Sequence, residues 1–364
     1  IDMGKKIASK KKEQEQEEKL STEIVKVDSK EALTAVKHDL EYVNGEGFSI
    51  RNRDFDLVAD NFLYDEFGAK YSQDGKKLLK SANVEHYTVA AGTEVICKHA
   101  FSENLCLKTI EIPDSVTIIE ENAFGGCANL CQIAFPRCLQ KIDKDAFKCC
   151  SSLKTIELPS FLTSIGESSF MACTALQSII IPKYVERIGE RAFEDCSELV
   201  FVALPKFLQS IDGMAFKNCK SLQSVVVPEY VKKIGCNAFR NCNSLVSVAI
   251  PNSVMSIDHD AFLGCSSLKF VNIPNAMSEF ACSMFYKCKS LENVVIPNSV
   301  TNIEDWTFYG CDNLQSVVIP DSVMSIGPKA FDDCGNLQSI VIPIGTKSKF
   351  EELLPNQKHL LVEK

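Results

Sequence analysis

The sequence predicts a repeat solenoid with a parallel β-sheet along one face and a cap at each end. Ten of the 17 cysteines recur every 23 residues, from Cys127 to Cys334. Eleven of the 13 prolines and a series of phenylalanines from Phe101 to Phe331 keep the same period without an insertion. Because a 23-residue unit could not bury its own apolar side, neighbouring units must stack and share one core.

Each unit begins with a short strand. In one representative unit, Val317 and Ile319 are two residues apart, which places their side chains on the same face of a strand. The strand ends at Pro320, because proline lacks the N–H that a continuing ladder would need. Equivalent strands of successive units are expected to pair in parallel, about 4.8 Å apart.

The rest of each unit returns the chain to the next strand. Val323 and Ile326 predict a second extended stretch that faces the core, and the following Gly327 is expected to let the chain turn a corner. The segment from Ala330 to Cys334 has apolar residues three apart and no proline. This spacing predicts a single helical or 3-10 turn that buries phenylalanine and cysteine.

The repeating cysteines are expected to be free, buried thiols. Equivalent side chains in stacked coils lie about 4.8 Å apart and parallel, whereas a disulfide needs converging β-carbons about 3.5–4.5 Å apart. Metal or redox chemistry would need paired C-x-x-C motifs or cysteines beside histidines, and Cys149–Cys150 is the one adjacent pair in the sequence. We therefore expect no metal and no cofactor. The many reduced thiols favour a reducing compartment.

The segments on either side of the repeats differ from them in composition. They divide the chain into a charged N-terminal tail with a helix (1–45), an N-terminal cap with a β-hairpin (46–92), the solenoid (93–343) and a C-terminal cap (344–364). An amphipathic helix is expected from Asp28 to Tyr42, a hairpin around Asp74–Gly75, and a closing helix from Lys347 to Leu354. Such caps are needed because the terminal coils of a solenoid would otherwise expose core residues.

The repeat itself resembles a known family. The pattern L-x-x-V-x-I-P-x-x-V-x-x-I-x-x-x-A-F-x-x-C, over residues 93 to 343, is similar to the BspA-like or treponemal-type leucine-rich repeat of bacterial proteins. The resemblance implies a curved leucine-rich-repeat solenoid with the parallel sheet on the concave face and short helical or 3-10 turns on the convex face. It also implies a non-enzymatic protein, since most known members are surface or adhesion proteins.

Two surfaces are candidates for ligand binding. The first is an apolar stretch of outward residues on the sheet: Ile180, Phe201, Ala203, Val226, Ala249, Phe270, Val295 and Val318, with Val200 and Val246 beside them. The second is an aromatic stripe two residues after the prolines: Phe161, Tyr184, Phe207 and Tyr230, where other units have serine. A contiguous apolar patch marks a binding site. The alternatives are ordinary β-propensity for the first surface and packing over the core at a wider corner for the second.

An enzyme would need a catalytic constellation, and the sequence has no phosphate-binding loop, zinc-protease, nucleophile-elbow or dinucleotide motif. The acid-flanked His259 lies at a variable corner of its unit, so we interpret it as a surface residue. A net charge of −9 argues against nucleic acid, and no stretch approaches the roughly 20 apolar residues that cross a bilayer.

Two functions therefore remain. The first is a cytoplasmic scaffold that binds a protein partner, or a second copy of the chain to form a homodimer, through the sheet; the start of the chain carries no secretory signal. The second is a secreted or cell-surface adhesin-like module, its signal removed, that binds extracellular protein, peptide or glycan through the aromatic stripe. Attachment of the lysines in residues 5–12 to a membrane surface is a weaker third alternative.

Overall fold

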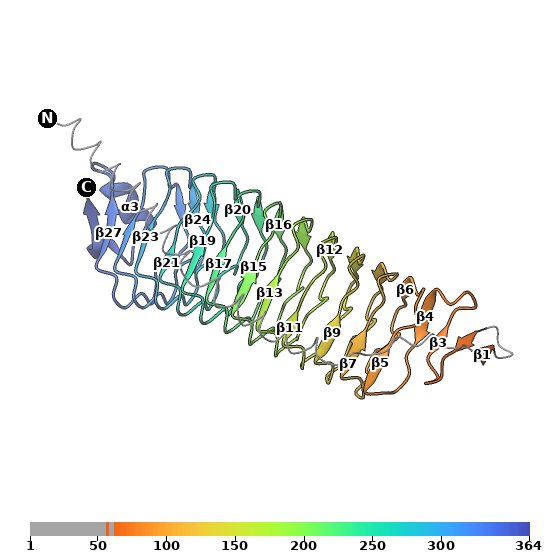
Figure 1. Cartoon of the computed structure of the whole chain (residues 1–364). Coiled ribbons are helices and arrows are strands. Elements are labelled where there is room, and N and C mark those ends of the chain that lie inside the picture. The colour runs from red at the N-terminus through yellow and green to blue at the C-terminus, as the bar shows by residue number, and fades with distance from the viewer. Residues whose placement is uncertain (1–55, 58–61) are drawn as a thin grey trace. The chain divides into compact units, whose positions relative to one another are not determined.

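The computed structural model describes residues 56–57 and 62–364, all within one compact unit, Arg51–Lys364 (Figure 1). The expected tail and its helix from Asp28 to Tyr42 lie outside the described residues. Within the part of the chain that is described, no helix is both long enough and apolar enough to span a membrane.

Each coil contributes one strand to each of two parallel columns (Figure 1). The first strand column contains β5 (His86–Thr88), β7 (Thr109–Glu111), β9 (Gln132–Ala134), β11 (Thr155–Ile156), β13 (Ser178–Ile180), β15 (Phe201–Ala203), β17 (Ser224–Val226), β19 (Ser247–Ala249), β21 (Phe270–Val271), β23 (Asn293–Val295), β25 (Ser316–Val318) and β27 (Ser339–Ile342). The second strand column contains β4 (Lys77–Lys80), β6 (Val95–Ile96), β8 (Ile118–Ile119), β10 (Lys141–Ile142), β12 (Ser164–Ile165), β14 (Arg187–Ile188), β16 (Ser210–Ile211), β18 (Lys233–Ile234), β20 (Ser256–Ile257), β22 (Glu279–Phe280), β24 (Asn302–Ile303) and β26 (Ser325–Ile326). Paired residues such as Ile179 and Val202 are one repeat apart, which confirms the parallel solenoid.

Antiparallel strands precede the first coil. β1 (Asp56–Leu57), β2 (Leu63–Tyr64) and β3 (Lys70–Tyr71) pair in sequence, and β3 pairs with β4 across the turn at Asp74–Gly75. β4 then pairs in parallel with β6, so the hairpin continues directly into the second strand column. Beneath it, the Tyr87 hydroxyl donates to Asp65 Oδ2 at 2.6 Å.

The last coil is covered by the C-terminal segment. Helix α3 (Lys347–Leu353) lies within the span expected for a closing helix, and it places Phe350 and the following Leu354 in the core. A 3-10 helix, η2 (Lys358–Leu360), leads to β28 (Leu361–Glu363), which pairs in parallel with β27 and extends the first strand column. The repeat pattern did not predict this last strand, because it has none of the repeat's spacing.

The phenylalanines form a continuous stack inside the solenoid. From Phe101 to Phe331, successive rings are 4.7–5.6 Å apart and within 14° of parallel. Between Phe147 and Phe308 the spacing is 5.4–5.6 Å, which exceeds the 4.7–4.9 Å typical between strands.

The phenylalanine segment is a run of turns rather than the expected helical turn. From the coil of Phe101 to that of Phe308, two residues per coil are left-handed; in the second coil they are Asn122 (φ 54°) and Gly126 (φ 77°). A left-handed residue cannot continue a right-handed helix. Instead, the Phe124 N–H donates across to the Ala146 carbonyl of the next coil at 2.8 Å, which ties neighbouring coils together on this side.

The buried cysteines have a structural role on the same side. All 17 cysteines of the chain are unpaired, which confirms the expectation of free thiols. The Phe124 carbonyl accepts the N–H of Cys127 at 3.1 Å and the thiol of Cys150, one coil later, at 3.2 Å. The same thiol bond recurs along the solenoid, and at its start Asn104 occupies the cysteine position and donates to the Ala82 carbonyl at 2.9 Å. Cysteine is therefore a buried hydrogen-bond donor between coils.

The recurring glycine after the second strand has a different cause from the one expected. Gly166 has no positive φ and so needs no special backbone conformation. A β-carbon there would lie 2.6 Å from the carbonyl carbon of Asp143 in the preceding coil. The glycine is present because the backbones of the two coils approach closely.

Candidate binding surface

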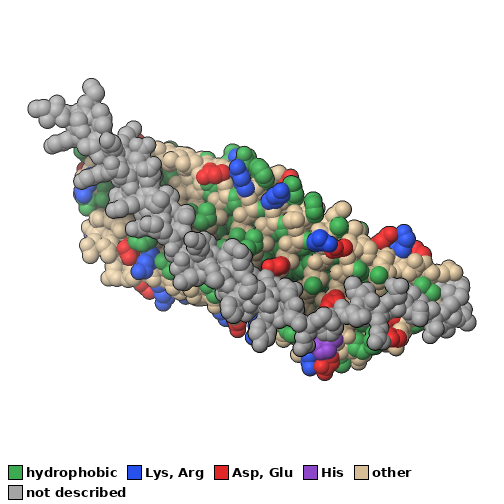
Figure 2. Space-filling view, viewed as in Figure 1, with side chains coloured by type: hydrophobic (Ala, Val, Ile, Leu, Met, Phe, Trp, Pro, Cys, Tyr) green, Lys and Arg blue, Asp and Glu red, His purple; other side chains and the backbone are tan. Residues whose placement is uncertain are grey.

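The apolar residues predicted on the sheet lie on the outward side of the first strand column. Ile180, Val226, Phe270, Val295 and Val318 are 40–67% exposed. Phe201, Ala203 and Ala249 are half-buried, and Val200 and Val246 are 40% and 42% exposed. We call these ten residues the apolar face. Figure 2 shows hydrophobic side chains gathered in rows across the middle coils.

The strand register brings members of the apolar face into contact along the column. Ile180 is paired with Ala203, Val226 with Ala249, and Val295 with Val318. Asn272 lies between the second and third of these pairs. Its side-chain amide accepts from the Ile250 N–H and donates to the Ile250 carbonyl, so it interrupts the ladder. The apolar face therefore consists of two stretches separated by one amide.

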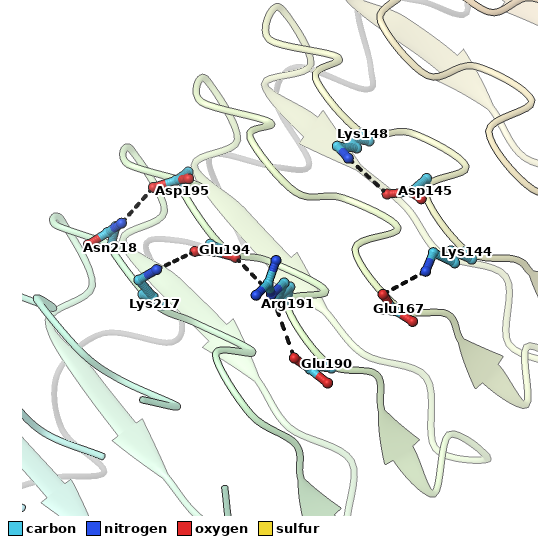
Figure 3. Close-up of polar contacts among 10 residues, drawn as sticks. All are labelled: Lys144, Asp145, Lys148, Glu167, Glu190, Arg191, Glu194, Asp195, Lys217 and Asn218. Carbon is cyan, nitrogen blue, oxygen red and sulfur yellow. Dashed lines mark hydrogen bonds and ion pairs between the residues drawn. The ribbon is translucent and has the colours of Figure 1, made fainter. Parts of the chain in front are cut away.

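Charge is distributed unevenly around the coil. On β13 to β27 of the first strand column, the charged residues at or directly before the outward positions are Lys269 and Glu292. On the phenylalanine side, charged residues are common and paired between coils (Figure 3), as Lys144 with Glu167 and Lys217 with Glu194, each at 2.7 Å. Glu194 is the most buried of these, with 6% of its side chain exposed, and Arg191 supplies a second cation at 3.7 Å.

The aromatic stripe lies at the corner after the prolines, outside the buried core. Phe161, Tyr184, Phe207 and Tyr230 are 59%, 48%, 50% and 49% exposed. The coil spacing brings Phe207 and Tyr230 into contact, with ring centroids 5.5 Å apart. Lysines that the sequence pattern did not single out lie beside the rings: Lys183 Nζ is 4.5 Å from the centroid of Tyr184 and Lys206 Nζ is 5.7 Å from that of Phe207. The sequence signal that could have identified these lysines is their position directly after proline in the repeat.

The acid-flanked histidine lies at an exposed corner. His259 Nδ1 is 3.1 Å from Asp260 Oδ2, while Asp258 is paired with Lys233 of the preceding coil at 2.9 Å. A hollow of about 240 Å³ beside His259 is lined by residues of two neighbouring coils, such as Met255 and Glu279. A wider hollow of about 630 Å³ opens beside Phe331 at the C-terminal end. Neither hollow contains a residue of the apolar face or the aromatic stripe.

One coil departs from the repeat in its core residues. Met277, Phe280 and Met284 occupy the positions of Val, Ile and Ala in the repeat pattern, and all three are buried. The Phe280 ring meets the rings of Phe285 and Phe308 edge-on, at 6.5 and 5.9 Å between centroids. The ring of Phe280 therefore packs against the phenylalanine stack inside the core.

Comparison with known proteins supports the resemblance in the repeat. The chain matches the family described as BspA type leucine rich repeat region over residues 75–200, 163–292 and 278–360. A comparison with curated proteins finds no match.

The solved structures to which the chain is similar include three from bacteria. A leucine rich cell surface protein from Faecalibacterium prausnitzii A2-165 is 25% identical, with a TM-score of 0.47 over 86% of this chain and 98% of that one. A leucine-rich repeat protein from Bacteroides ovatus ATCC 8483 is 23% identical, with a TM-score of 0.47 over 85% and 98%. The leucine rich repeat protein of T. pallidum is 24% identical, with a TM-score of 0.42 over 61% and 91%. With its family match extending over most of the repeats, the chain belongs to the BspA-type leucine-rich repeat family.

Proposed function

We propose that this protein is a non-enzymatic scaffold that binds a protein partner on the apolar face. The observation that carries the proposal is the combination of exposed aliphatic and aromatic side chains with the scarcity of charge on β13 to β27. The centres of protein interfaces are depleted in charge and enriched in aromatic residues. Strand propensity explains valine and isoleucine at these positions, but it does not explain why lysine and glutamate give way to glutamine and serine.

A variant that changes only this surface tests the proposal. Phe201→Ser and Phe270→Ser install the residue that Ser224 and Ser247 provide in neighbouring coils, so the fold should be retained. We expect a specific partner captured by the wild type to be lost by the double variant. A matched control, Glu111→Ser, changes the same column outside the apolar face and should capture the partner normally.

The source of the partner decides between compartments. Cys106, Cys131, Cys138 and Cys149 are exposed and unpaired, a state that a reducing compartment preserves. We therefore expect the partner in lysate of the source cells, and capture should be insensitive to salt because few charges face it. Identical capture by the wild type and the serine variant would refute the apolar face as the site. Self-association detected by sedimentation would identify the partner as a second copy.

A second candidate function is an adhesin-like module that binds extracellular protein or glycan. It is favoured by the exposure of the aromatic stripe, whose rings contribute little to the core. Capture from extracellular material that depends on Tyr184 and Tyr230, and not on Phe201 and Phe270, would support this candidate over the first.

A further inference from the structure

The fold does not require aromatic residues at the stripe. In four other coils a serine occupies the position two residues after proline. In two of them its hydroxyl donates to the backbone of the preceding coil, whereas the Ser115 and Ser299 hydroxyls are buried without a hydrogen-bond partner among the described residues. Ser253 Oγ donates to the Val231 carbonyl at 2.9 Å, and Ser322 Oγ donates to the Val300 carbonyl at 2.8 Å. The four aromatic residues give up this bond and project into solvent instead. Their presence in four successive coils therefore points to a ligand rather than to the folding of the corner.

The spacing of the rings indicates the form of the ligand. The Phe207 and Tyr230 rings are 5.5 Å apart and tilted by 50°, which leaves no room for a planar group between them. A ligand can therefore contact the outer edges and faces of the rings, which lie in a row with one ring for each coil. An extended polysaccharide fits this arrangement, because each pyranose unit advances by a length close to one coil and presents C–H groups that pack on aromatic rings.

The charges beside the row indicate the chemistry of that polysaccharide. Lys183 and Lys206 occupy equivalent positions in neighbouring coils, and Lys232 lies at the next turn of the chain after Tyr230. Within the described part of the chain, these three lysines form no ion pair, whereas the lysines of the phenylalanine side shown in Figure 3 do. Glu229 is the one acidic residue among those that directly precede the four rings. Unpaired ammonium groups at the repeat spacing complement carboxylates carried by successive sugars.

We propose that the aromatic stripe binds an extended uronic-acid polysaccharide, whose sugar rings pack on Phe161, Tyr184, Phe207 and Tyr230 and whose carboxylates contact Lys183 and Lys206. This inference rests on the second candidate function and names its ligand. It is independent of the apolar face. A single-stranded nucleic acid would also use rings and lysines, so oligothymidylate serves as the competing probe.

Calorimetric titration of the full chain tests the proposal. The probes are short oligomers of galacturonate and mannuronate, each long enough to cover four coils, together with methyl-esterified oligogalacturonate as a neutral match. At least one acidic oligomer should bind. If it is the galacturonate, the ester should bind more weakly.

Two variants separate packing from charge. Tyr184→Ser with Tyr230→Ser installs the residue found at Ser253, so a melting temperature near that of the wild type is expected. Affinity should fall about tenfold, since two aromatic packing contacts are removed. Lys183→Gln with Lys206→Gln should weaken binding of the acidic oligomer and reduce its dependence on salt.

Controls on the other surface keep the outcomes distinct. Phe201→Ser with Phe270→Ser should bind the oligomer as the wild type does. The proposal is overturned if no acidic oligomer binds, if the tyrosine variant binds unchanged, or if oligothymidylate binds in place of every glycan. An extracellular protein captured through Tyr184 and Tyr230 in the absence of glycan binding would retain the adhesin function but refute the glycan as its ligand.

Discussion

Raising the pH should unfold the solenoid by ionising the thiols that connect its coils. Nine of the ten cysteines at the repeating position are fully buried, and all ten donate to a backbone carbonyl of the preceding coil. Burial raises the pKa of Cys127 and of Cys265 to about 12, and raises the pKa of Cys219 and Cys242 well above the ordinary range. The folded chain therefore keeps these protons where the unfolded chain has lost them.

The size of the effect follows from linkage. An unfolded thiol titrates near 8.5, so between pH 8.5 and the raised folded pKa the unfolded state binds fewer protons and the free energy of unfolding falls. At pH 10 the loss is about 2 kcal/mol for each buried thiol. Ten such thiols would cost about 20 kcal/mol, which exceeds the 5–15 kcal/mol stability of typical domains. We expect full stability below about pH 8 and unfolding near pH 10.

Urea unfolding followed by circular dichroism at pH 7.5 and pH 9, under reducing conditions, measures this loss while the chain is still folded. Cys219→Ala with Cys242→Ala removes two titrating groups, so its loss of stability between the two pH values should be about 1.5 kcal/mol smaller than that of the wild type. At pH 7.5 the variant should be less stable, because each substitution leaves a small cavity and removes a thiol bond. Cys106→Ala with Cys138→Ala, at exposed positions, is the matched control and should follow the wild type.

The comparison between variants decides the matter, since lysines and tyrosines also titrate at high pH. If the buried-cysteine variant lost as much stability as the wild type and the exposed-cysteine control, the thiols would not be the cause. A wild-type stability that stayed constant from pH 7.5 to pH 9 would refute the reasoning altogether.

Two further predictions concern the phenylalanine side. Phe216→Ala should lower the free energy of unfolding by about 3–5 kcal/mol in urea unfolding, because Phe216 is buried and stacked on both faces; Phe331→Ala at the end of the stack should cost less, and equal losses would argue against the stack. Ala172→Gly should raise the melting temperature and increase the free energy of unfolding by about 1 kcal/mol, because Ala172 is left-handed at φ 57° and Gly126 occupies the equivalent position two coils earlier. Ala134→Gly, on a strand, should lower the melting temperature. A lower melting temperature for both variants would contradict the backbone argument.

The repeat predicted each coil and its stacking on neighbouring coils, because every unit has the same buried positions. It missed what depends on contacts between coils. Hydrogen bonds from the Phe124 segment to the next coil form in place of the expected helical turn. Gly166 is present because its backbone lies close to Asp143, and not because a corner needs the conformational freedom of glycine. Strand β28 carries no repeat and was not predicted. The domain boundaries at 45, 92 and 343 stay predictions, as do the roles of the two candidate surfaces.

The sequence by itself determined that this protein is a stacked solenoid of 23-residue coils with free thiols, since a period without insertions leaves one way to bury its apolar positions. It also determined which residues share a column. The tertiary structure alone decided which side chains of each column are exposed and which contact the next coil. The ring of Tyr184 is half-exposed, whereas Ser253 at the equivalent position is hydrogen-bonded to the backbone. Val295 is paired with Val318, whereas Asn272 interrupts the ladder. These differences arise between coils, where two backbones and their side chains meet, and no single repeat contains them.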